Sequence, residues 1–208
     1  MDSLPAPLRI GDVAPDFTAR STAGDIRLSD NRGRWVVLFS HPADFTPVCT
    51  TEFVALAREA DAFAERDCAL IGLSVDSLFS HLAWLSIIHD RFGVEVRFPV
   101  VEDPTMVIGR AYGMVAQGDP DSATIRSTFF IDPEGVVRAI TTYPANVGRS
   151  IPELLRTLDA LQAVDGTDLL APAGWQQGDP LMRPAANELD EVFAAGSEGG
   201  WFLREASS

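Results

Sequence analysis

The chain has 208 residues, of which 46% are hydrophobic and 22% are charged, and its formal net charge is −14. This composition is typical of a globular protein with one domain and an appendage. So acidic a chain is not expected to bind nucleic acid or an anionic membrane, since both require a basic face. All 16 Lys/Arg positions are arginine, which excludes lysine Schiff-base chemistry and a P-loop lysine.

Targeting and metal-binding signals are missing from the sequence. The first residues have no basic start followed by an apolar stretch, and no apolar run is long enough for a membrane span, so a cytoplasmic protein is expected. Two cysteines make no disulfide framework. The three histidines do not cluster with them along the chain, so no structural zinc site is predicted.

Strands and helices are expected to alternate through the first half of the chain. The first 30 residues indicate loop and short strands around a turn at 22–25, and a hairpin with a DPEG turn is expected over 123–144. Apolar runs typical of buried strands lie at 35–40, 68–76 and 97–103. Helical spacing or helix start and stop signals mark 47–66, 77–93, 103–113 and 146–166. The order predicts an α/β protein with a central mixed β-sheet flanked by helices.

The last 40 or so residues differ in composition, being rich in Gly, Pro and Trp with little periodicity. We expect one domain over residues 1–165 and an extended arm over 166–208. Apolar residues in the arm favour packing on a second subunit, and hence a homodimer or a higher homo-oligomer. They are Trp175, Leu181, Met182, Trp201 and Phe202.

Cys49 lies at the start of the first long predicted helix. With Thr46 as N-cap and Pro47 as the first helical residue, Cys49 is the third residue of the first turn. Amides are unpaired there and the helix dipole is positive, which stabilises a thiolate and prepares a nucleophile. The alternative is a small apolar side chain packed at a helix start.

Three charged residues belong to the same hypothesis. Glu52 follows Cys49 by three positions on the same side of the helix and could anchor an arginine from elsewhere. Arg126 lies in a predicted strand and Arg149 precedes a helix. A buried strand arginine needs an anionic partner, for which a thiolate would serve, whereas a solvated sheet edge is the alternative for Arg126.

The stretch PADFTPVC, within FSHPADFTPVCTTE, resembles the PxxxTxxC signature of the peroxiredoxins, and most closely their one-cysteine, peroxiredoxin-6-like class. The similarity continues in GDVAPDF, LIGLSVDS, HLAW, YPANVGR and GWQQGDP, and so spans nearly the whole chain. This resemblance implies a thioredoxin-like fold and reduction of hydrogen peroxide and organic hydroperoxides by an external thiol, without a cofactor.

The resemblance also implies roles for the residues that match the motifs. Cys49 would be the peroxidatic nucleophile, while Thr46 and Arg126 would hold the peroxide and stabilise developing charge. Pro42 would pack over the thiolate, and His41 would line the pocket. Glu52 and Arg149 would lie behind Arg126 and support it.

Cys68 is not expected to resolve the Cys49 sulfenic acid. A continuous helix over 47–66 would separate the two cysteines by about 28 Å at 1.5 Å per residue, far beyond the roughly 7 Å that a disulfide allows. A one-cysteine mechanism is therefore predicted, with an intersubunit contact left open.

Other function classes remain as alternatives. A disulfide oxidoreductase needs CxxC, but residues 49–52 read CTTE. A cysteine hydrolase would pair Cys49 with His41, His81 or His89 as the base. A peroxide-sensing or holdase-type redox switch would consume about one peroxide per Cys49, whereas an enzyme turns over.

Overall fold

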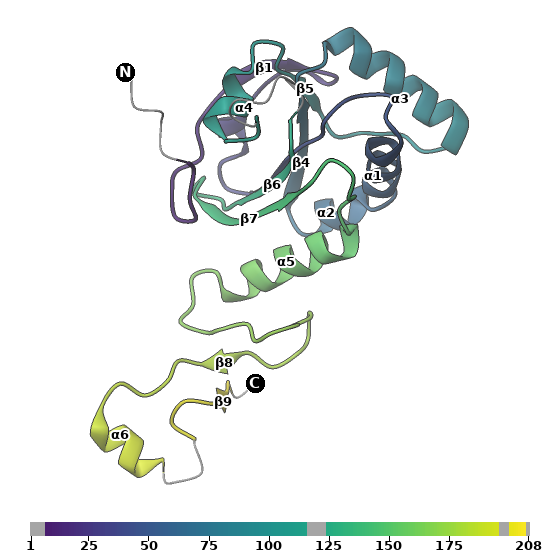
Figure 1. The fold of residues 1–208 in the computed structure, drawn as a ribbon. Coiled ribbons are helices and arrows are strands. Elements are labelled where there is room, and N and C mark those ends of the chain that lie inside the picture. Colours follow the sequence, from purple (N-terminus) through teal and green to yellow (C-terminus); the bar gives the residue numbers. More distant parts are fainter. Residues whose placement is uncertain (1–6, 116–123, 196–199, 207–208) are drawn as a thin grey trace, which may run out of the picture. The chain divides into compact units, whose positions relative to one another are not determined.

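The architecture of this computed structural model follows the predicted alternation of strands and helices (Figure 1). Residues 7–115, 124–195 and 200–206 are described. They fall into two compact units, residues 1–151 and 152–208, each described by itself below. No helix in these residues is long and apolar enough to cross a membrane.

The first unit is built on a seven-stranded mixed sheet in the order β2-β1-β5-β4-β3-β6-β7. Its central strands β3, β4 and β5 are parallel, and the outer pairs are antiparallel. The strands are β1 (Thr18–Ser21), β2 (Gly24–Arg27), β3 (Trp35–Ser40), β4 (Cys68–Ser74), β5 (Val100–Glu102), β6 (Arg126–Ile131) and β7 (Val137–Tyr143). The predicted strands and hairpin are confirmed, although residue 123, where the hairpin prediction began, lies outside the described residues.

Every residue of β3 is buried, which explains its continuous apolar run. Val36 and Leu38 belong to a core cluster that also contains Ile108, and so lie on the α4 face of the sheet. Val37 and Phe39 alternate with them, and the Phe39 ring packs edge-on against Phe53 of α1. β3 is therefore covered on both faces, as a central strand of an α/β sheet should be.

The described residues of the first unit form five helical segments before residue 151. They are η1 (Leu28–Asn31), α1 (Pro47–Arg58), α2 (Ala60–Glu65), α3 (Leu78–Phe92) and α4 (Val107–Ala111). Figure 1 shows α1, α2 and α3 gathered on one side of the sheet. α3 has the expected ends, because the Ser77 hydroxyl caps its first turn and Gly93 closes it in the left-handed conformation at φ 64°.

Three helix predictions need correction. The helix expected over 146–166 begins only at residue 151, as α5 (Ile151–Val164). The expected single helix over 47–66 is broken at Glu59, which adopts φ −101° and ψ 7° between α1 and α2. The segment 103–113 is helical only over α4, because Asp103 instead accepts hydrogen bonds from the amides of Val107 and Gly109.

The second unit contains α5 (Ile151–Val164, whose first residue belongs to the first unit), β8 (Met182–Arg183), α6 (Leu189–Ala194) and β9 (Arg204–Glu205). The arm predicted as extended thus carries a short helix and a two-stranded antiparallel sheet, β8–β9. Backbone bonds also join Leu170 to Met182 in both directions. Trp175 is buried, and its indole nitrogen donates to the Asp179 carbonyl.

Candidate active site

Cys49 occupies the third position of α1, as the sequence predicted. Thr46 is the N-cap, with extended backbone at φ −99° and ψ 149°, and Pro47 is the first helical residue. The preceding residue, Phe45, has a positive φ of 57°, so a tight turn directs the chain from β3 into the helix. The Cys49 side chain is fully buried.

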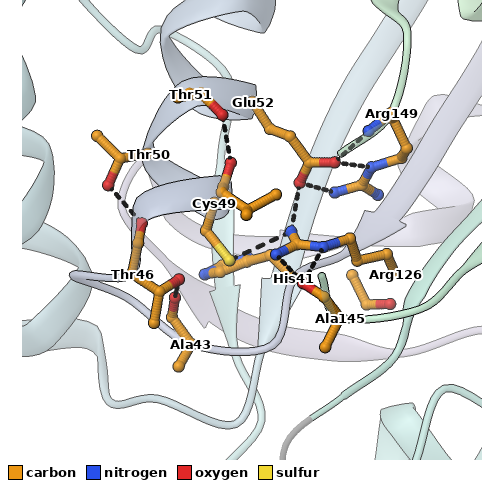
Figure 2. A network of polar contacts seen from close by, with 12 residues as sticks. His41, Ala43, Thr46, Cys49, Thr50, Thr51, Glu52, Arg126, Ala145 and Arg149 are labelled. Atoms are coloured by element: carbon orange, nitrogen blue, oxygen red, sulfur yellow. Dashed lines mark hydrogen bonds and ion pairs between the residues drawn. The ribbon is translucent and has the colours of Figure 1, made fainter. Parts of the chain in front are cut away.

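Arg126 is brought to Cys49 by the pairing of β6 with β3. Its Nη1 donates to the Cys49 sulfur at 3.3 Å and to Glu52 Oε2 at 2.6 Å. Nε and Nη2 both donate to the carbonyl of Ala145, at 3.1 and 2.8 Å. The guanidinium is therefore fixed at both ends, and its alternative placement on a solvated sheet edge is wrong (Figure 2).

Glu52 joins the two arginines that the sequence singled out. Arg149 donates to its carboxylate from the backbone amide at 2.7 Å, from Nε at 2.9 Å and from Nη2 at 2.7 Å. Burial raises the pKa of Glu52, but the hydrogen bonds and charge of Arg149, with the charge of Arg126, outweigh this and hold the pKa below its usual value. Arg149 also stacks over the ring of Phe39, with 5.0 Å from Cζ to the centroid.

The Thr46 hydroxyl does not cap the helix. It donates to the carbonyl of Ala43 at 2.8 Å, and no amide of α1 bonds to it. This corrects the expectation of a capping role, since the hydroxyl instead stabilises the loop that precedes Cys49. Pro42 is partly buried in the same loop, and its predicted packing over the sulfur stays a prediction.

His41 is buried directly after β3, with its ring 4.8 Å from that of Phe53 and stacked at 5.3 Å on Trp84. Two residues that were not predicted to contact His41 accompany it. Asp44 bonds His41 Nε2 at 2.8 Å, and His81 from α3 bonds the other carboxylate oxygen at 2.8 Å. The signal for Asp44 was its place three residues after His41, whereas His81 comes from a separate helix that chain spacing does not relate to it.

Cys68 lies at the far end of the sheet from this site. Cys68 is the first residue of β4 and pairs in register with Trp35, the first residue of β3. The loop that leads to Cys49 leaves β3 at the opposite end, after its last residue. The six residues of β3 span about 16 Å at roughly 3.3 Å per step. Burial raises the pKa of the Cys68 thiol to about 12. Because the helix is broken at Glu59, the distance between Cys49 and Cys68 cannot be taken from one continuous helix. The length of β3 keeps the two cysteines apart instead.

A buried cysteine at a helix N-terminus, hydrogen-bonded to a fixed arginine beside a thioredoxin-like sheet, defines a thiol-based redox protein. The model of the AhpC/TSA family matches residues 10–140. The chain is 50% identical to peroxiredoxin 2 of Caldanaerobacter subterraneus over 184 residues, covering 88% of this chain and 83% of that one. It belongs to the AhpC/TSA family and is a peroxiredoxin, a thiol peroxidase.

Solved structures agree over nearly the whole chain. A yeast mitochondrial 1-Cys peroxiredoxin matches with a TM-score of 0.85 at 40% identity, covering 97% of this chain and 100% of that one. A mutant of peroxiredoxin 6 from Arenicola marina matches with a TM-score of 0.85 at 33% identity, covering 96% and 97%. A 2-Cys peroxiredoxin from Plasmodium vivax matches with a TM-score of 0.80 at 32% identity, covering 90% and 100%.

Proposed function

We propose that Cys49 is the peroxidatic cysteine of a one-cysteine peroxidase that reduces hydrogen peroxide and organic hydroperoxides. The observation that carries this proposal is the 3.3 Å hydrogen bond from Arg126 to the buried Cys49 sulfur at the start of α1. A cation and a helix N-terminus at one sulfur favour the thiolate, which is the nucleophilic form.

In the proposed reaction, the Cys49 thiolate attacks the hydroxyl-bearing oxygen of the hydroperoxide. The S–O bond forms as the O–O bond breaks, and the proton of the attacked oxygen goes to the departing oxygen. Sulfur is thereby oxidised to the sulfenate, which gives sulfenic acid on protonation, and water or an alcohol leaves. Thr46 and Arg126 hold the peroxide and stabilise the charge that develops on its oxygens. Glu52 and Arg149 keep the Arg126 guanidinium in place, and Pro42 and His41 line the pocket.

We assign the second half-reaction to an external thiol. One thiol forms a mixed disulfide with the Cys49 sulfenic acid and releases water, and a second thiol restores Cys49 and leaves as the disulfide. Cys68 is unsuited to this step because it is buried at the opposite end of β3 and β4. A reductant of the glutathione or thioredoxin class fits, since the yeast relative is described as resolved through glutathione/thioredoxin systems.

The deciding experiment is peroxide consumption with excess dithiothreitol for the wild type, Cys49→Ser and Cys68→Ser. Loss of turnover only in Cys49→Ser is the expected result. Activity that survives Cys49→Ser would overturn the proposal, and loss in a folded Cys68→Ser would mean that Cys68 resolves the sulfenic acid across subunits. Consumption of a single peroxide per chain despite dithiothreitol would favour the redox-switch alternative.

We also propose that the chain associates with itself. The second unit exposes apolar side chains on α6, where Leu189 is 71% and Phe193 is 74% exposed. Apolar surface of this kind favours a protein contact. Sedimentation of the wild type should show a dimer or larger species, and Leu189→Glu with Phe193→Glu should shift it toward monomer. A monomeric wild type would contradict this proposal.

A further inference from the structure

Asp44 holds two buried histidines at once, and the proposed chemistry of Cys49 leaves this arrangement unused. Its Oδ1 lies 2.8 Å from His41 Nε2 and its Oδ2 lies 2.8 Å from His81 Nδ1. Both histidines are fully buried, and Asp44 is 6% exposed. His41 comes directly after β3, Asp44 from the loop before α1 and His81 from the first turn of α3, so the fold assembles the group from separate segments.

The hydrogen positions in the group follow from the carboxylate. Burial raises the pKa of Asp44, but hydrogen bonds and charge from His41 and His81 outweigh it and hold the pKa far below the usual value. An ionised carboxylate only accepts, so His41 Nε2 and His81 Nδ1 both carry hydrogens. Burial lowers the pKa of His41 against the opposing effect of Asp44, which favours its neutral ring. Nδ1 of His41 is then a bare acceptor.

That acceptor has no partner among the described residues, although it is buried. Buried polar atoms without a hydrogen bond are rare enough to require an explanation. The His41 ring packs against Phe53, which follows Cys49 by one turn on the buried face of α1. Figure 2 draws His41 among the residues around Cys49. A hydroperoxide at Cys49 brings the missing partner, because its terminal oxygen carries a hydrogen.

The geometry points to a positioning role for Asp44 and His81: they hold His41 so that its Nδ1 accepts the hydrogen of the oxygen that reacts at Cys49. This inference rests on Cys49 being the peroxidatic residue. As sulfur bonds to that oxygen and the O–O bond breaks, the proton moves to Nδ1. It then passes to the departing hydroxide or alkoxide, which leaves as water or alcohol, and Cys49 remains as the sulfenate. Charge and protons balance without a further reactant.

A second layer keeps Asp44 in place. Asp76 accepts a hydrogen bond from the Asp44 amide at 3.0 Å and another from the Ser74 hydroxyl at 2.8 Å. His81 Nε2 lies 3.3 Å from the carbonyl of Val101 in β5. Although the three groups lie close enough to ligate a metal, each carboxylate oxygen already has its own histidine at hydrogen-bond distance. The Asp44 carboxylate is therefore satisfied as the centre of a hydrogen-bonded chain.

The test is Asp44→Ala, which removes the acceptor of both histidines. The first readout is single-turnover consumption of hydrogen peroxide without reductant, and we expect its second-order rate constant to fall at least about tenfold. The second is the tautomer of His41 from ring nitrogen NMR, which is tractable because the chain has three histidines. His41 should lose its fixed Nε2–H form. The matched control is Asp90→Ala, which removes an exposed carboxylate 3.4 Å from His89 and should leave both readouts unchanged.

A rate constant that stays within twofold of wild type, or a slower rate with an unchanged His41 tautomer, would overturn the inference. If Asp44→Ala does not fold, His81→Ala and His81→Asn decide, because the asparagine amide can replace the Nδ1 donor. We expect His81→Asn to recover at least half of the rate lost in His81→Ala. Stoichiometric metal in the purified wild type, lost with Asp44, would replace this role by a metal site. Cys49→Ser, measured in parallel, separates failure of this inference from failure of the proposed function. Peroxide consumption that survives in Cys49→Ser would refute the proposed function itself.

Discussion

Replacing Glu52 by glutamine should destabilise the protein and slow Cys49 oxidation together. The carboxylate is 2% exposed and receives four hydrogen bonds, three from Arg149 and one from Arg126. A glutamine can keep its oxygen at the Oε1 position, where the amide and Nε of Arg149 donate. Its NH₂ group would then face Arg126 Nη1 and Arg149 Nη2, so donors would meet donors.

The magnitude follows from those two contacts, which are 2.6 and 2.7 Å long in the wild type. A hydrogen bond to a charged group contributes about 1.5–3 kcal/mol, and breaking a buried ion pair costs about 3–5 kcal/mol. We therefore expect the free energy of unfolding of Glu52→Gln to be about 3–5 kcal/mol lower at pH 7. The rate constant of Cys49 oxidation should also fall, because Arg126 loses one of the groups that fix it.

The pH dependence tests the electrostatic part of this reasoning. Since the folded-state pKa of Glu52 lies below the ordinary glutamate value of about 4.5, its stabilisation is fully present above about pH 4.5 and is lost as pH falls through the folded-state pKa. Urea unfolding should show the gap between wild type and Glu52→Gln shrinking from pH 7 toward pH 3. A gap below about 1 kcal/mol at pH 7, or one that is constant with pH, would refute the argument. Glu153→Gln is the control, because its exposed pair with Arg156 should contribute at most about 1 kcal/mol.

One labelling experiment and two substitutions test further local features. Because burial raises the Cys68 pKa to about 12, iodoacetamide at pH 8 should leave Cys68 unmodified in the folded protein by mass spectrometry, and rapid labelling would contradict this. Thr46→Val should lower the rate constant for reaction with peroxide about tenfold or more. Its free energy of unfolding should fall by about 1 kcal/mol, because the hydrogen bond to Ala43 is lost. An unchanged rate constant would exclude the hydroxyl from the reaction. Gly135→Ala should lower the free energy of unfolding, measured in urea, by about 1–2 kcal/mol, because φ is +80° and a Cβ would meet Arg32. A variant as stable as the wild type would refute this expectation of strain.

The elements were predictable where one signal dominates. The β3 run is continuous because both of its faces are buried, and α3 shows its ends through Ser77 and Gly93. The break at Glu59 has no such signal, because neither proline nor glycine occurs there and the change from α1 to α2 lies in one residue's backbone angles. The short α6 in the C-terminal arm was missed because six residues give too little periodicity to count.

The site divides in the same way. Cys49 and Thr46 were found because a helix start is local in sequence, and the need of a buried arginine for an anion led to Arg126. The geometry around Thr46 was less predictable, since its hydroxyl can accept from the helix or donate to the loop, and only the folded loop decides. His81 reaches Asp44 across 37 positions, so no spacing rule could have joined them.

The buried charges around Cys49 give a physical reason for both halves of the proposed reaction. Arg126 and Arg149 bring two positive charges to the single negative charge of Glu52, and all three side chains are at most 2% exposed. A thiolate at Cys49 cancels the remaining positive charge, so the thiolate form avoids a buried, uncompensated cation. Once the sulfenate takes up a proton, Cys49 carries no such charge, and the excess positive charge returns. The positive charge attracts an incoming thiolate, which supports attack by a thiol in the second half-reaction.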